Sequence, residues 1–126
     1  SLKNIKPVME KLEFEEVKDR LDRLSEKEKK HKQNAYTSGN RDVLTNFKRI
    51  AERLKINPLK VWAVYFNKHV DAINTYSDSG LEAEPIDTRF ADALNYLYLG
   101  YALIEEQNGN KRQISDTTES GGHPGR

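Results

Sequence analysis

Two neighbouring stretches decide the fold of this chain: PLKVWAVYFNKHVDAINTY (residues 58–76) and EPIDTRFADALNYLYLGYALIEEQ (residues 84–107). Both are apolar almost all round, and neither alternates with the two-residue period of a strand. A helix that is apolar on every side is typical of a protein interior. Charged residues nevertheless interrupt both stretches, and a buried carboxylate is costly unless it is paired, hydrogen-bonded or bound to a cation. The sequence therefore predicts two central helices whose charges either pair with one another or line a site.

Two further helices are expected before this pair. Residues 9–32 are highly charged, and their apolar side chains recur at helical spacing, which predicts an amphipathic helix with a wet outer side. The turn-forming residues 34–40 predict a loop, and a helix is expected over residues 41–55. Asn57 and Pro58 then have the order of an N-cap and a first helical residue, so the third helix should begin there.

The end of the chain has a different composition. From Asn108 onward the sequence is rich in Gly, Ser and Thr and has no apolar period, which predicts a disordered tail over residues 108–126. Gly100, inside the fourth helix, predicts the close approach of another backbone. The sequence thus predicts one all-α domain over residues 1–107, with a four-helix bundle-like core and a long charged N-terminal helix.

Composition narrows the classes of function. The 126 residues include no cysteine, and no run approaches the roughly 20 apolar residues of a membrane span. We therefore expect a soluble, cytoplasmic protein without thiolate chemistry or a membrane partner. The three histidines have no zinc spacing, and His69 is expected to be a core or interface residue.

Charge is unevenly distributed along the chain, although the formal net charge is only +1. Residues 34–69 carry a net charge of +5, whereas residues 70–107 carry −7. Two interpretations fit this asymmetry: complementary faces of packed helices, or a cationic surface that meets an anionic ligand beside a carboxylate cluster.

Acidic side chains of the two central helices are the first candidate site. Residues three or four apart share a helix face, so Lys68 lies with Asp71 and Glu84 lies with Asp87, while Asp92 and Asn95 form a neighbouring row. Antiparallel packing would bring these rows together. Several carboxylates in one pocket suit Mg²⁺, which commonly binds one or two carboxylates plus substrate phosphates. The alternative is that Lys68 and Arg89 pair with Asp71 and Asp92 and close the bundle.

A second candidate lies in the predicted loop before the second helix. Asn34, Tyr36 and Arg41 are hydrogen-bond donors there, and the free amides of a helix N-terminus attract anions. We expect this segment to contact a base, a ribose or a phosphate, with Arg41 on a phosphate. Most loops of this composition are only turns.

The spacing Lys68-x-x-Asp71, followed after twelve residues by Glu84-x-x-Asp87, resembles the E-x-x-E, spacer, E-x-x-D pattern of MazG-like all-α nucleotide pyrophosphohydrolases. The wider run over residues 30–105, with its segment around Asn46, also resembles small phage proteins of the MazG-like or nucleotide-modification-associated kind. This chain departs from the pattern in one place, because Lys68 stands where the family has its first Glu.

The resemblance implies a homo-oligomer (a dimer or tetramer) that uses Mg²⁺ to cleave a nucleoside triphosphate to a monophosphate and pyrophosphate. It implies that Asp71, Glu84 and Asp87 bind the metal, and Asp92 is a possible replacement ligand. The corresponding catalytic candidates are Lys68, Asp71 and Glu84, and the substrate-binding candidates are Asn34, Tyr36, Arg41, Asn46 and Asn95.

Other functions remain open at this point. Because a lysine replaces the first Glu, the protein could bind a nucleotide without hydrolysing it. A separate alternative, which fits the absence of a defined motif, is a phage-type interaction or inhibitor protein whose charged first helix docks on a host partner. Residues 47–61 also have the rhythm of a helix-turn-helix. The second helix of that motif would present Trp62 and Phe66 where a DNA reader needs polar side chains, so nucleic-acid binding is the weakest alternative.

Overall fold

The computed structural model describes the backbone of residues 8–37 and 41–118, and the side chains of residues 8–32 and 41–109. It contains four helices, α1 (Lys11–Thr37), α2 (Thr45–Leu54), α3 (Pro58–Ser79) and α4 (Ile86–Thr118), and the described residues contain no strand. The helices pack against one another around a bundle-like core. The all-α prediction is confirmed.

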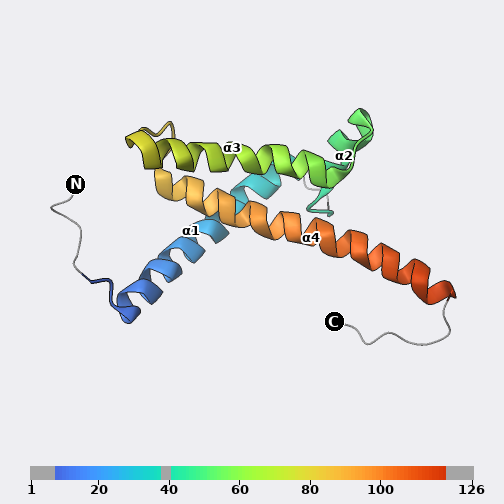
Figure 1. Ribbon diagram of the computed structural model, residues 1–126, viewed down its shortest axis with the longest axis horizontal. Helices are drawn as coiled ribbons and strands as arrows, with labels where there is room; N and C mark the ends of the chain where they lie inside the picture. Colours follow the sequence, from blue (N-terminus) through green and yellow to red (C-terminus); the bar gives the residue numbers. More distant parts are fainter. Residues whose placement is uncertain (1–7, 38–40, 119–126) are drawn as a thin grey trace.

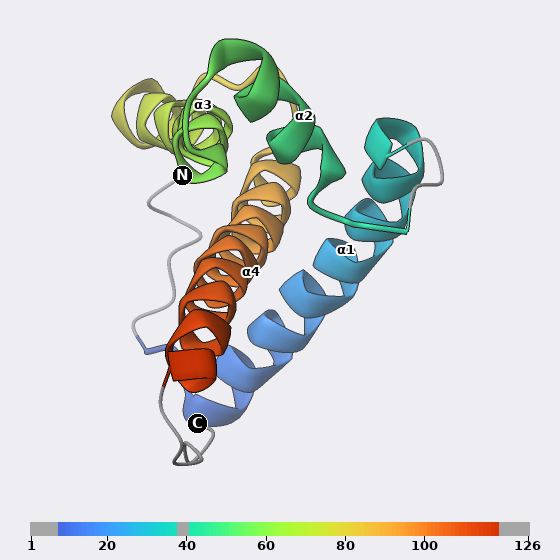
Figure 2. The same ribbon diagram turned by 90° about the vertical axis from the view of Figure 1, so that its right-hand side faces the viewer.

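Helix α4 is the central element of the molecule. It runs antiparallel to α3 along one side, and α1 crosses it on another side (Figure 1). Seen along the orthogonal direction, α4 lies between α3 and α1, with α2 above it (Figure 2). The ends of α1 and α4 project away from this crossing (Figure 1).

Local sequence explains the bounds of α3. The Asn57 side chain accepts a hydrogen bond from the Leu59 amide at 2.9 Å, which caps the first turn, and Pro58 occupies the first helical position. Gly80, with φ +73°, ends the helix in the left-handed conformation that glycine adopts without strain. The predicted start of this helix is confirmed.

Three other boundaries differ from the prediction. Helix α1 continues to Thr37, so the first residues of the predicted loop are helical, and residues 38–40 lie outside the described part. Helix α2 begins only at Thr45, because the Asp42 carboxylate accepts the Leu44 amide at 2.9 Å and holds the preceding turn. Helix α4 continues past Gln107 to Thr118, and residues 119–126 lie outside the described part.

The core forms where α2, α3 and α4 meet. Its buried residues are Leu44, Phe47, Ala51, Val61 and Leu103. Trp62 packs beside them and donates from Nε1 to the Tyr96 carbonyl at 2.6 Å. Gly100 lies under this indole ring, so the close approach predicted there is made by a side chain of α3 and not by its backbone.

None of the helices within the described residues has both the length and the apolar character that a membrane span requires.

Candidate functional site

A pocket of about 330 Å³ opens between α1, α2 and α4. This volume lies at the lower end of the range of small-molecule sites. Three of the residues predicted from the sequence line it, Asn46 from α2 and Asp92 and Asn95 from α4. Charged, aromatic and aliphatic side chains complete the wall: Glu26, Glu28, Lys29, Lys32, Val43, Phe47, Tyr96, Tyr98 and Leu99.

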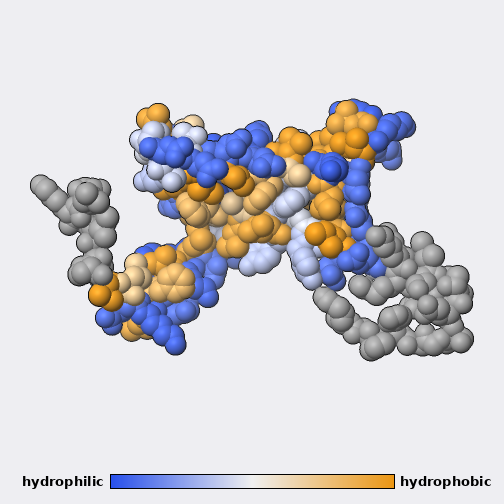
Figure 3. Space-filling view, in the orientation of Figure 1, coloured by the Kyte–Doolittle hydropathy of each residue, from blue (hydrophilic) through white to orange (hydrophobic). Residues whose placement is uncertain are grey.

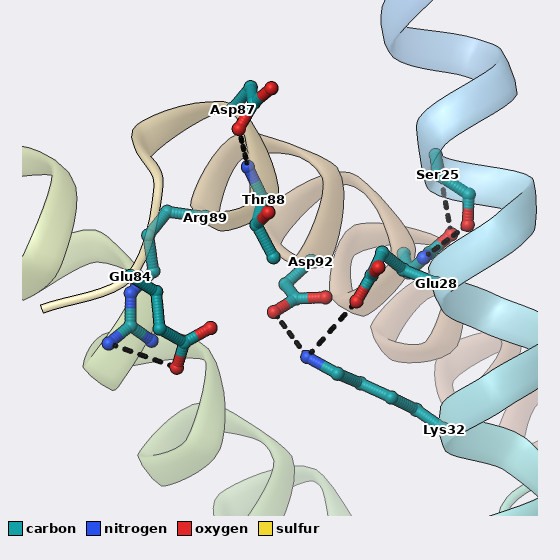
Figure 4. Close-up of polar contacts among 9 residues, drawn as sticks. Ser25, Glu28, Lys32, Glu84, Asp87, Thr88, Arg89 and Asp92 are labelled. Atoms are coloured by element: carbon teal, nitrogen blue, oxygen red, sulfur yellow. Dashed lines mark hydrogen bonds and ion pairs between the residues drawn. The ribbon is translucent and has the colours of Figure 1, made fainter.

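An ion pair joins α1 to α4 at this pocket. The Asp92 carboxylate is only 2% exposed and its Oδ2 lies 2.6 Å from Lys32 Nζ. Glu28, one turn before Lys32, places its Oε1 3.8 Å from the same ammonium group. Figure 4 shows Lys32 Nζ between the two carboxylates. Asp92 is therefore neutralised by a residue of the N-terminal helix, and not by Lys68 or Arg89.

A second polar link joins the same two helices, one turn further along α4 and two turns earlier in α1. The Ser25 hydroxyl donates to Asn95 Oδ1 at 2.6 Å, and Asn95 Nδ2 donates to the Ser25 carbonyl at 2.9 Å. Ser25 is buried and Asn95 is half-buried. Both hydrogen bonds fix the position of the Asn95 amide at the pocket wall.

His69 of α3 stands beside this polar group. Its ring packs on Tyr96 with 4.9 Å between ring centroids. Nδ1 is buried and has no hydrogen-bond partner among the described residues. Burial lowers the pKa of His69 below its ordinary value; Asp92 and Glu84 oppose this effect, whereas Arg89 and Lys32 add to it. Burial therefore favours the neutral form of the imidazole.

A further ion-pair group ties α2 to the C-terminal half of α4. Lys48 Nζ donates to Asp42 Oδ2 at 2.6 Å and to Glu106 Oε2 at 2.9 Å. The hydrogen bond from Lys48 lowers the pKa of Asp42, and the same bond raises the pKa of Lys48. All three side chains are about 40% exposed, so we assign them a role in joining the helices and only a small contribution to stability.

The carboxylates that the family resemblance implies as metal ligands are placed apart from the pocket. Lys68 and Asp71 are exposed on α3. Glu84 Oε2 lies 3.5 Å from an Arg89 nitrogen. Asp87 accepts the amide of Thr88 at 2.8 Å and points away from Asp92 (Figure 4). No group of three or more acidic, histidine or cysteine side chains that could hold a metal ion occurs among the described residues.

The substrate-binding candidates of the N-terminal half also differ in whether they reach the pocket. Asn46 reaches the pocket and accepts a hydrogen bond from Arg49 at 2.6 Å. Arg41 is exposed and is not part of the pocket wall. The side chains of Asn34 and Tyr36 lie outside the described residues.

Sequence reasoning missed the contribution of α1 to the site. Ser25, Glu28 and Lys32 follow Leu21 at intervals of four, three and four residues, so they continue its apolar stripe with polar side chains. A stripe that changes from apolar to polar without changing face is a signal that the helix still packs there against polar partners. That signal was present in the sequence.

No protein family, curated protein or solved structure matches this chain.

Proposed function

We propose that the protein binds a nucleotide in the pocket between α1, α2 and α4. One observation carries the proposal: three residues predicted from the sequence as ligand contacts, Asn46, Asp92 and Asn95, line the same pocket although two different helices supply them. Amide side chains can read the edge of a base, and the exposed ring of Tyr98 offers a surface on which a base can stack. The ammonium group of Lys32 can release its two carboxylate partners and bind phosphate oxygens instead.

We further propose that the bound nucleotide is a triphosphate, hydrolysed to a monophosphate and pyrophosphate with the help of Mg²⁺. In this reaction a water oxygen bonds to the α-phosphorus, the bond to the bridging oxygen breaks, and pyrophosphate leaves. Mg²⁺ would neutralise the charge that develops on the phosphates. Glu28 and Asp92 already face one cation, Lys32 Nζ, and two carboxylates with phosphates are a usual magnesium set.

One observation favours the alternative in which the protein binds the nucleotide without cleaving it. The ammonium group of Lys32 is 2.6 Å from the buried Asp92 carboxylate and neutralises it. A metal ion would have to displace this ammonium. In the non-catalytic alternative Lys32 stays in place and contacts the phosphates itself.

The test combines a binding measurement with a turnover measurement. Purified protein is mixed with each deoxynucleoside or ribonucleoside triphosphate, with and without Mg²⁺, and thermal shift and pyrophosphate release are recorded. We expect one nucleotide to raise the melting temperature, and Asn46→Ala to weaken that binding at least about tenfold. Asn74→Ala is the matched control, because Asn74 is exposed on α3 and away from the pocket.

Further variants separate the possible outcomes. Pyrophosphate release could be lost in Asp71→Ala and Glu84→Ala and retained in Asn46→Ala. That result would place the site near the end of α3 and the start of α4, and would contradict the assignment of the site to the pocket. A shift without release would support the non-catalytic alternative. If no nucleotide shifts the melting temperature or is cleaved, the proposed function is wrong.

A further inference from the structure

The face of α4 that points away from the core is apolar and uncovered. Phe90, Leu97, Tyr101 and Ile104 are 45%, 50%, 55% and 39% exposed. Their spacing of seven, four and three residues puts them on one stripe, and the half-buried Leu94 lies within it. We call these five residues the α4 stripe. In the space-filling view, apolar residues gather at the centre of the molecule, where α4 passes (Figure 3).

The α4 stripe lies opposite the side that packs inside the molecule. Asp92, Tyr96 and Leu103 face α1, α2 and α3, roughly half a turn of the helix away from Leu97 and Tyr101. A helix that is apolar on all sides is stable in water only when every side is covered. Because α1, α2 and α3 leave the α4 stripe uncovered, this face of the helix is suited to an interaction with a partner.

We propose that a second copy of this chain covers the α4 stripe, with the two α4 helices antiparallel about a two-fold axis at Leu97. The stripe is nearly symmetric about that residue: Phe90 and Leu94 precede it by seven and three residues, and Tyr101 and Ile104 follow it by four and seven. Antiparallel pairing therefore places Leu97 against itself, Phe90 against Ile104, and Leu94 against Tyr101. Such a self-complementary patch is what a two-fold interface requires.

Charge favours the antiparallel direction. Acidic residues gather where α3 ends and α4 begins: Asp78, Glu82, Glu84 and Asp87. At the opposite end of α3, the exposed acid Glu52 is outnumbered by exposed basic residues: Arg53, Lys55 and Lys60. Glu106 of α4 lies at the same end and is paired with Lys48. That basic end lies beside the C-terminal half of α4, since Gln107 Nε2 donates to Asn57 Oδ1 at 2.8 Å. The 22 residues of α3 separate the two ends by about 33 Å.

A two-fold axis at Leu97 reverses one copy relative to the other. The acidic end of each copy then faces the basic end of its partner, whereas a parallel pairing would place like charges together. This distribution of charge also argues that the partner is a second copy of the chain. Each copy carries the apolar α4 stripe and, on either side of it, the two oppositely charged ends that would pair across the interface. This inference does not depend on the nucleotide proposal.

The first test is the mass of the full chain in solution, measured by sedimentation or light scattering across about 1–100 μM. We expect twice the chain mass at the upper concentrations. Leu97→Glu and Tyr101→Glu should each weaken association at least about tenfold, because each buries a carboxylate in the pair. Val64→Glu is the matched control: Val64 is 65% exposed on the outer face of α3, and its variant should associate like the parent. Circular dichroism checks that all three variants stay helical.

Single cysteines test the geometry, since the chain has no cysteine of its own. Under mild oxidation Leu97→Cys should form a disulfide-linked dimer. Phe90→Cys and Ile104→Cys should link to each other when mixed, and neither should link to itself.

Three results would overturn the proposal. If the parent chain stays monomeric, or if Leu97→Glu leaves the dimer intact, the α4 stripe is not the interface between two copies. The same conclusion holds if the stripe binds a different protein. Phe90→Cys linked to itself would show parallel pairing and contradict the two-fold axis at Leu97.

Discussion

Gly100 of α4 is covered by the indole ring of Trp62 from α3. A Cβ built on Gly100 would lie 2.4 Å from Cε2 and 2.5 Å from Cζ2 of Trp62, far inside normal contact distance. The indole cannot easily move aside, because its Nε1 donates to the Tyr96 carbonyl at 2.6 Å. We therefore expect Gly100→Ala to destabilise the protein by about 1–3 kcal/mol, measured by urea unfolding, in spite of the better helix propensity of alanine.

Gly109 provides the matched control for this substitution. It also lies in α4, and a Cβ there would meet nothing within 4 Å. Gly109→Ala should leave stability unchanged or raise it by up to about 1 kcal/mol. Equal effects of the two substitutions would mean that Trp62 does not pack on Gly100 as described.

His69 gives the protein a pH dependence at mildly acid pH. Burial lowers the pKa of its imidazole in the folded state relative to the ordinary value of 6.5, so the unfolded chain takes up the proton first as the pH falls. The stability that this neutral histidine contributes is present above pH 6.5 and is lost as the pH falls through 6.5 towards the lower folded value. One proton changes the free energy of unfolding by at most about 1.4 kcal/mol per pH unit.

The prediction is checked by urea unfolding at pH 7.5 and pH 5.5. His69→Gln should lose less stability between these two pH values than the parent does. His31→Gln should behave like the parent, because His31 is exposed. A parent and a His69→Gln variant with the same pH dependence would show that this imidazole titrates normally.

At the scale of the element, α2 ends in an unfavourable conformation. Lys55 has φ +60° and ψ +45°, the left-handed region that favours glycine, and its amide closes the helix on Ala51 and Glu52 carbonyls. Lys55→Gly should therefore stabilise the protein by about 0.5–1 kcal/mol in thermal or urea unfolding. Lys60→Gly removes the same charge from the first turn of α3 and should destabilise it by up to about 1 kcal/mol. Destabilisation in both variants would contradict the assigned conformation of Lys55.

The helix boundaries also show which features of the fold could be predicted from the sequence. Asn57 and Pro58 fixed the start of α3 because capping and a proline at the first position are local effects. The end of α1 was not predictable in this way: Asn34–Thr37 has turn-forming composition, yet the helix continues through it. Composition likewise placed the end of the fourth helix near Gln107, whereas α4 continues to Thr118.

The candidate site depends on contacts between α1 and α4, and no local sequence pattern specifies these contacts. Asp92 and Asn95 were identified because polar residues are unusual in an apolar helix. Their partners Lys32 and Ser25 lie at least 60 residues earlier in the chain. The crossing of α1 over α4 selects these partners, and an equally charged face of α1 elsewhere remains in water. Periodicity therefore predicted which side chains of α4 needed partners, but tertiary packing decided which residues supplied them.

At the scale of the whole molecule, the described chain buries little apolar surface for its length. Seven hydrophobic residues are buried among the described residues, and three of them are alanines, whereas sixteen large hydrophobic residues are exposed. Apolar burial is the main favourable term in folding. A single copy with so small a core would be weakly stable, and covering the α4 stripe would add the burial that it lacks.

Stability should therefore depend on protein concentration. If the dimer proposed above contributes to folding, each tenfold rise in concentration stabilises the folded dimer by about 1.4 kcal/mol through mass action, which raises Tm by about 2–5 °C. Calorimetry at about 5, 50 and 500 μM measures this slope, and Leu97→Glu should melt at a lower temperature that no longer changes with concentration. Val64→Glu should keep the slope of the parent, because its exposed position lies outside the α4 stripe. A flat slope in the parent would mean that one copy folds without help from a second, and the exposed residues of α4 would then need a different physical reason.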